Sequence, residues 1–144
     1  MKLHLGVKSD PIQYRYSYEW LFSLLSREGV SSVQLGSFFE LHFVEDGYFI
    51  GMKELAAKHG IAITSVFTAH RELGGFFTGN SFLEAAAAKA YRRHVAVAAL
   101  LGAESAGANA GAVNRDQMQL KARGSAAYLE HMKNMMTYAK ELGL

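Results

Sequence analysis

The chain has 144 residues, half of them hydrophobic, which is enough for one domain with a hydrophobic core. A net charge of +2 is too small to predict a partner such as nucleic acid or a membrane surface. There is no cysteine for disulfide or thiolate chemistry and no apolar run of signal-peptide or membrane-spanning type, so a soluble cytoplasmic protein is expected.

Strand and helix patterns alternate along the whole chain. In chain order, the predicted elements are strand Lys2–Lys8, helix Tyr18–Arg27, strand Ser32–Phe39, helix Gly47–Lys58, strand Ile61–Ala69, helix Phe82–Leu101, a strand within Glu104–Asn109 and a helix over about Asn114–Leu142. Ser17 and Ser81 are candidate N-caps, and Gly124–Ser125 is expected to divide the last helix. In that helix Tyr128 and Met136 are expected on one apolar face.

Glycines stand where each helical pattern ends, at Gly29, Gly60, Gly102 and Gly143. Glycine is favoured just past a helix because it adopts the left-handed conformation without a Cβ clash. These glycines lie roughly 30 to 40 residues apart, which is the size of one strand-loop-helix unit. Alternating strands and helices predict an α/β fold with a parallel sheet and right-handed crossovers.

Two architectures fit this order of elements. One is a small open doubly wound sheet, and the other is part of a (β/α)₈ barrel, which needs roughly 250 residues. Gly143–Leu144 reads like the approach to a fifth strand, where the sequence stops. We therefore expect residues 1–144 to form a single domain, the parallel (βα)₄ half of a TIM barrel.

Several segments together resemble the xylose isomerase-like TIM barrels, the sugar phosphate isomerase/epimerase superfamily. They are "LGVKSDPIQYRYSYEWLFSLL", "VQLGSFFELH", "GIAITSVFTAHRELGGFF", "AGANAGAVNRDQM" and "YLEHMKNMMTYAKELGL". The resemblance covers nearly the whole chain and corresponds to the amino-terminal half of that barrel. It implies a sugar or sugar phosphate as the small-molecule partner, and metal-assisted proton transfer beside a carbonyl as the chemistry of the full-length enzymes.

The resemblance also implies what this chain lacks. Members of the superfamily bind a divalent metal such as Mn, Mg or Zn through glutamate, aspartate and histidine ligands from strands five to eight. The sequence ends before strand five, so no metal ligand is carried over. We expect the isolated chain to bind no metal and to be inactive as an isomerase. A non-catalytic α/β binding or interaction module is the alternative function.

His70 is the sharpest candidate for a site residue. It follows the β-rich stretch "TSVFTA" and precedes a glycine-rich loop, and strand carboxyl ends carry the sites of α/β proteins. In the family that the chain resembles, a histidine here faces the pocket. Glu40 is the second candidate catalytic residue, and His42, two positions further along the predicted strand, would share its face. The alternative for each is a polar residue bonded within a loop.

Lys8 and Asn109 are candidate substrate-binding residues at the ends of the first and fourth strands. A lysine suits a phosphate or hydroxyl group, and an amide can donate to and accept from hydroxyls. The alternatives are a surface ion pair between Lys8 and Asp10 and a turn asparagine.

Two further stretches each allow two interpretations. The loop "RELGGFFTGN" has the glycines of a mobile lid, with Phe76 and Phe77 as its apolar area, or else these phenylalanines pack on the barrel rim. The cluster "KAYRRH" falls within a helix, so Arg92 and Arg93 are expected to point to solvent. The superfamily that the chain resembles also contains endonuclease IV-type nucleases, and a solvated basic face disfavours that branch.

A half-barrel sheet also has two unpaired edges and an open inner face. Val33, Leu35 and Val66, or their neighbours in the other register, would lie on that face. Unpaired edges pair readily with other chains. We therefore expect a homo-oligomer, or a carboxyl-terminal half supplied by another part of the protein.

Overall fold

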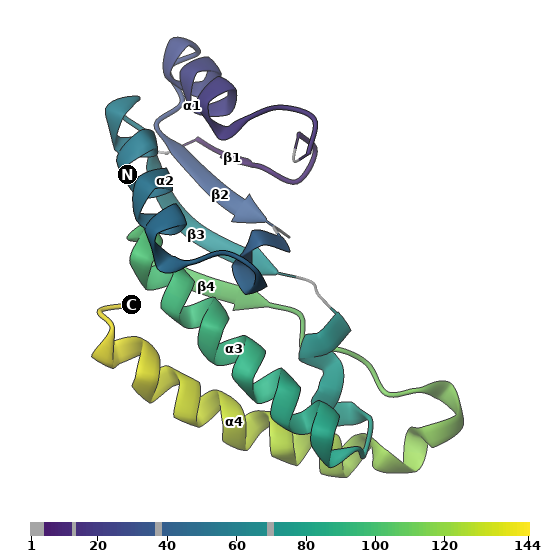
Figure 1. Cartoon of the computed structure of the whole chain (residues 1–144). Coiled ribbons are helices and arrows are strands. Elements are labelled where there is room, and N and C mark those ends of the chain that lie inside the picture. Colours follow the sequence, from purple (N-terminus) through teal and green to yellow (C-terminus); the bar gives the residue numbers. More distant parts are fainter. Residues whose placement is uncertain (1–4, 13, 37–38, 69–70) are drawn as a thin grey trace.

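The computed structural model describes residues 5–12, 14–36, 39–68 and 71–144 (Figure 1). Its strands are β1 (Gly6–Lys8), β2 (Ser32–Gly36), β3 (Ala62–Thr68) and β4 (Ser105–Ala108). Its helices are α1 (Tyr18–Arg27), α2 (Asp46–Lys58), α3 (Ser81–Leu101) and α4 (Lys121–Glu141). Three 3₁₀ segments lie between them: η1 (Phe39–His42), η2 (Arg71–Phe77) and η3 (Arg115–Leu120).

The four strands form one parallel sheet in the order β1-β2-β3-β4. A doubly wound sheet would reverse direction at a switch point and place helices on both faces. Here each strand instead lies beside its predecessor, as in a barrel, and the helices lie together on one side of the sheet (Figure 1). The predicted (βα)₄ half-barrel is confirmed, and the doubly wound alternative is wrong.

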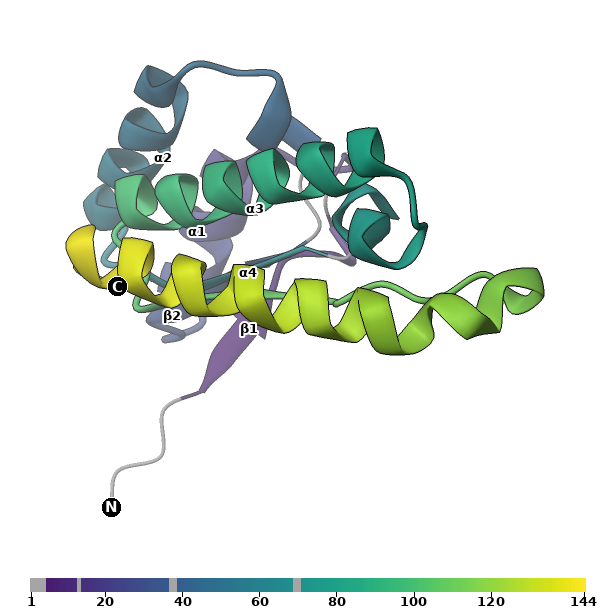
Figure 2. The ribbon, with the colours of Figure 1, turned by 90° about the horizontal axis from the view of Figure 1, so that it is seen from below.

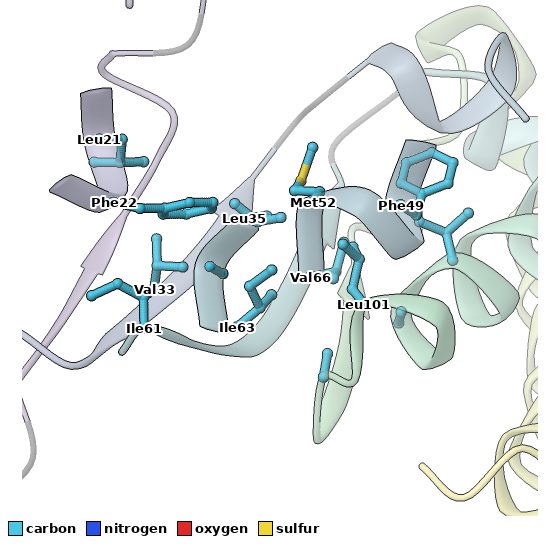
Figure 3. Packing of buried hydrophobic residues seen from close by; sticks show 14 of the residues in the cluster. Leu21, Phe22, Val33, Leu35, Phe49, Met52, Ile61, Ile63, Val66 and Leu101 are labelled. Atoms are coloured by element: carbon cyan, nitrogen blue, oxygen red, sulfur yellow. The ribbon is translucent and has the colours of Figure 1, made fainter. Parts of the chain in front are cut away.

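The hydrophobic core lies between the sheet and α1, α2 and α3 (Figure 3). Val33, Leu35 and Val66 are fully buried in it, because alternate strand residues point to the helices. The sequence left open whether these three residues or their neighbours would lie on the inner face of the sheet. Their neighbours occupy the inner face instead, in the other register that the sequence allowed.

Helix ends follow local chemistry. The hydroxyl of Ser17 accepts a hydrogen bond from the Trp20 amide at 3.2 Å, which confirms the predicted cap of α1. The cap of α3 is Asn80 rather than Ser81. The side-chain oxygen of Asn80 accepts hydrogen bonds from the backbone amides of Phe82 at 2.9 Å and Leu83 at 3.3 Å. Gly102 ends α3 with a φ of 71°, the left-handed stop that the sequence predicted.

The last helix differs from its prediction in where it breaks. The irregular segment is η3, with a non-helical Gln117, and α4 runs without interruption through Gly124. A Cβ at Gly124 would lie 2.7 Å from the Phe77 ring, so this glycine serves close packing. The buried face of α4 includes Met135, whereas Met136, which was predicted to lie on that face, is 60% exposed.

A second core joins η2, α3 and α4, which run side by side in Figure 2. Phe76 and Phe77 are buried in it against Tyr91 and Tyr128. A Cβ at Gly75 would collide with the Leu83 carbonyl oxygen. Phe76 and Phe77 are therefore packed side chains, as in the second interpretation of this loop, and they pack on α3 and α4.

Arg93 also departs from its prediction. Its guanidinium donates to the carbonyl oxygens of Leu41 at 3.1 Å and Val44 at 2.9 Å, and it forms an ion pair with Asp46. Arg93 is thus half-buried and ties α3 to the segment between β2 and α2, while Arg92 is exposed as expected. No helix in the described part of the chain is long and apolar enough to cross a membrane.

Candidate functional site

The candidate site is the inner face of the sheet, which we define by Lys8, Gln34, Ser65 and Phe67. These residues alternate with the buried ones in β1, β2 and β3, so their side chains point away from the helices. The side-chain amide of Gln34 donates to the Ser65 hydroxyl at 2.7 Å. The ammonium of Lys8 lies 4.9 Å from the centre of the Phe67 ring. Polar groups and one aromatic ring therefore share a face that the core does not use.

The carboxyl ends of β1 and β2 are joined by a short hydrogen-bonded connection. The Ser9 amide donates to the Gln34 carbonyl at 3.0 Å, and the Ser9 hydroxyl accepts from the Gly36 amide at 3.1 Å. A Cβ at Gly36 would lie 2.5 Å from both carboxylate oxygens of Asp10, so only glycine leaves room for this side chain. Asp10 in turn pairs with Lys8 at 2.7 Å. The predicted ion pair is confirmed, and it holds the ammonium at this edge.

Glu40 and His42 do not share a strand face, and this expectation is wrong. β2 ends at Gly36, and both residues belong to the 3₁₀ segment η1, in which positions two apart diverge. Glu40 lines a cavity of about 420 Å³ beside α1 and α2. His42 lines a different hollow of about 790 Å³ beside α3, together with Arg93. Their catalytic and substrate-binding roles stay predictions.

Asn109 follows β4 directly and is exposed at the same end of the sheet as Lys8, where the parallel strands have their carboxyl ends. Its backbone is fixed, because its amide donates to the Thr68 carbonyl at 3.3 Å and its carbonyl accepts from the Tyr91 hydroxyl at 3.2 Å. The side chain remains accessible to a ligand. His70 lies outside the described residues, so its predicted role stays a prediction.

The described side chains do not fit a metal ion. Among the side chains that the structure describes, no three His, Asp or Glu groups lie close enough together to hold one. The Glu40 carboxylate and the His42 imidazole instead line two different hollows. We therefore derive no catalytic step through a metal for this chain.

Gln34, Ser65 and Phe67 were not predicted from the sequence as site residues. The sequence did offer a signal for these site residues, because each of them is next to a buried apolar residue of the same strand. In a parallel sheet covered by helices on both faces, strands are almost continuously apolar. A glutamine between Val33 and Leu35 therefore indicates a face that no helix covers.

Similar architectures occur among solved structures. A xylose isomerase-like protein from Rhodospirillum rubrum matches 99% of this chain with a TM-score of 0.84 and 19% sequence identity. The match covers 52% of that protein. The chain has the fold of half a TIM barrel. D-psicose 3-epimerase from Clostridium cellulolyticum, solved with D-tagatose, matches the same 99% of this half-barrel with a TM-score of 0.76 and 12% identity.

A further D-psicose 3-epimerase structure, obtained in the presence of D-fructose, matches with a TM-score of 0.73 and 13% identity. The half-barrel spans about half the length of these proteins, with 50% of each epimerase covered. At such identities the likeness establishes the fold. No protein-family profile and no curated protein matches the sequence.

Proposed function

We propose that this half-barrel supplies part of the substrate-binding surface of a sugar isomerase or epimerase. The observation that carries the proposal is the polar inner face, with Lys8, Gln34, Ser65 and Phe67, on a fold shared with two epimerases solved with ketoses. Sugar hydroxyls need donors and acceptors in pairs, and an aromatic ring offers apolar area to the C–H face of a sugar.

Each residue of this face has a definite task in the proposal. Gln34 and Ser65 already bond to each other, so they present one joint set of donors and acceptors to a ligand. Lys8 places a positive charge beside the Phe67 ring, where it would meet a carbonyl oxygen or a phosphate. Asn109 adds an exposed side-chain amide at the carboxyl end of β4. His70, the candidate catalytic residue of the sequence, is proposed as the group that moves a proton.

The proposal is tested by a nuclear magnetic resonance titration with D-fructose and D-tagatose, with mannitol as a polyol that lacks a carbonyl. We expect saturable shifts for the amides of β2 and β3 with the ketoses and much smaller shifts with mannitol. Phe67→Ala is expected to weaken binding by about fivefold, the loss of one aromatic contact.

Phe82→Ala is the matched control, because Phe82 is 85% exposed at the start of α3, away from this face. If both variants bind ketoses like the wild type, the inner face is not the sugar site. If the wild type shows no saturable shift, the interaction-module alternative replaces the proposal.

A further inference from the structure

The cavity of about 420 Å³ beside α1 and α2 has no part in the proposed function. Its walls come from the loop between β1 and α1, from both helices and from η1. Its lining includes Leu21 and Leu55 together with Tyr14, Tyr18 and Tyr48. The two leucines belong to the core between the helices and the sheet, so the cavity lies on the opposite side of the sheet from the inner face. Its volume is in the range of small-molecule sites.

Glu40 contributes a carboxylate to the lining of this mostly apolar cavity. The Oε2 atom of Glu40 is buried and has no hydrogen-bond partner in the described structure. A buried carboxylate oxygen is costly unless it is paired. The other acidic residue of the lining, Glu19, is partly exposed and bonded to His59 at 2.9 Å. The burial of Tyr48 and the nearby charge of Glu40 both raise the pKa of the Tyr48 hydroxyl.

We propose that this lateral cavity binds a small organic ammonium ion, with the cation against the tyrosine rings and paired with Glu40. Aromatic rings attract alkylammonium groups through their negative faces, and a carboxylate supplies the counter-charge. The described lining includes no lysine or arginine, which disfavours an anion. A metal ion would need several oxygen ligands, and the wall offers mostly carbon.

The test uses choline and its uncharged isostere 3,3-dimethylbutan-1-ol, which have nearly the same shape. Binding is followed by the fluorescence of Trp20, the chain's single tryptophan, which stacks on Tyr16 at the cavity lining with ring centres 4.0 Å apart. We expect saturable binding of choline and at least tenfold weaker binding of the alcohol, because only the ammonium gains from the rings and the carboxylate. Equal binding of the two, or no binding of choline, would overturn the proposal.

Two variants assign the site. Glu40→Gln keeps the shape of the side chain but removes its charge, and we expect choline to bind about tenfold more weakly. Glu54→Gln makes the same change on the exposed surface of α2 and should leave choline binding unchanged. Unchanged binding by Glu40→Gln would refute the role of this carboxylate. The comparison of choline with the alcohol in the wild type decides the proposal even if that variant does not fold.

Discussion

Glycines in this chain serve different purposes, and their surroundings predict different effects of the same substitution. Gly75 lies so close to the Leu83 carbonyl that an added Cβ would collide with it. We predict that Gly75→Ala lowers the free energy of unfolding by about 2 kcal/mol, because backbone cannot move aside as a flexible side chain can. Urea unfolding measures this change.

Gly51 is the matched control, because it lies within α2 and has no atom within 4 Å of the position of an added Cβ. Alanine loses less backbone entropy than glycine in a helix, so Gly51→Ala should raise the free energy of unfolding by about 0.5 to 1 kcal/mol. If both variants lose the same stability, the packing of η2 on α3 is not as described.

His131 on α4 predicts a pH dependence of stability. Its ring packs between Phe76 and Tyr91, with ring centres 4.9 and 5.6 Å away, and burial lowers the pKa of this imidazole below its usual 6.5. The nearby phenol of Tyr91 is neutral in this range, since burial and its hydrogen bond with Tyr128 raise the pKa of Tyr91 well above its ordinary value.

Because the folded chain resists protonation of His131, the unfolded chain binds more protons below pH 6.5. The contribution of His131 to stability is therefore present above that pH and is lost as the pH falls toward the folded pKa. We predict that His131→Leu makes the free energy of unfolding less dependent on pH in this window. Denaturant unfolding at several pH values compares the two proteins, and identical slopes would contradict the assignment.

At the scale of the elements, substitutions of the two residues at the start of α3 should change the free energy of unfolding by different amounts. Asn80 accepts two backbone hydrogen bonds there, whereas Ser81 is already the first helical residue. Asn80→Ala should lower the free energy of unfolding by about 1 kcal/mol, the usual worth of an N-cap. Ser81→Ala should change it by less than about 0.5 kcal/mol. The reverse order of the two values would restore the cap that the sequence suggested.

The order and type of the elements could be predicted from the sequence, because each strand-helix unit ends at a glycine and carries the pattern of its type. The residues at which the elements end were harder to predict from the sequence. β2 ends at Gly36, whereas the sequence predicted a strand as far as Phe39. At Gly36 the carboxylate of Asp10 leaves room only for glycine, and a contact between residues 26 positions apart leaves no local signal. The segment "FFEL" is rich in strand formers yet includes part of η1, so tertiary context overrides local propensity there.

The site was predictable only in part for the same reason. Lys8 and Asn109 could be placed at one end of the sheet, because all strands of a parallel sheet have their carboxyl ends on the same side. Glu40 and His42 could not be separated, since their divergence depends on a 3₁₀ turn that the sequence pattern did not reveal. Phe76 and Phe77 resembled a lid in sequence because their partners, Tyr91 and Tyr128, lie on helices that follow later in the chain.

At the scale of the whole molecule, the first prediction concerns turnover. We predict that the isolated 144-residue chain does not isomerise D-fructose or D-tagatose, with or without added manganese or magnesium. The physical reason is that the described side chains bring no three metal-ligating groups together. A coupled assay over long incubation measures this, with His70→Ala as the control for contaminating activity. Turnover in the wild type that disappears in His70→Ala would refute the prediction.

The last prediction is that copies of the chain associate. The structure changes the physical reason for this prediction. Val33, Leu35 and Val66 are buried under the helices, so the inner face exposes polar groups and contributes little hydrophobic driving force. The edges of the sheet remain as possible contact surfaces. In the described sheet the outer edges of β1 and β4 pair with no other strand, and unpaired edges are templates for strand addition. We predict that copies of the chain associate through these edges rather than through the inner face.

Sedimentation equilibrium at tens of micromolar should show a homodimer or a larger assembly. Ser105 lies exposed on β4, so Ser105→Lys places a charge at the edge and should shift the equilibrium toward monomer. Thr137→Lys makes the same change of charge on the exposed surface of α4 and should leave the association unchanged. A wild-type monomer at these concentrations would show that both edges are protected by the twist and shortness of their strands, because short edge strands are themselves a barrier to pairing.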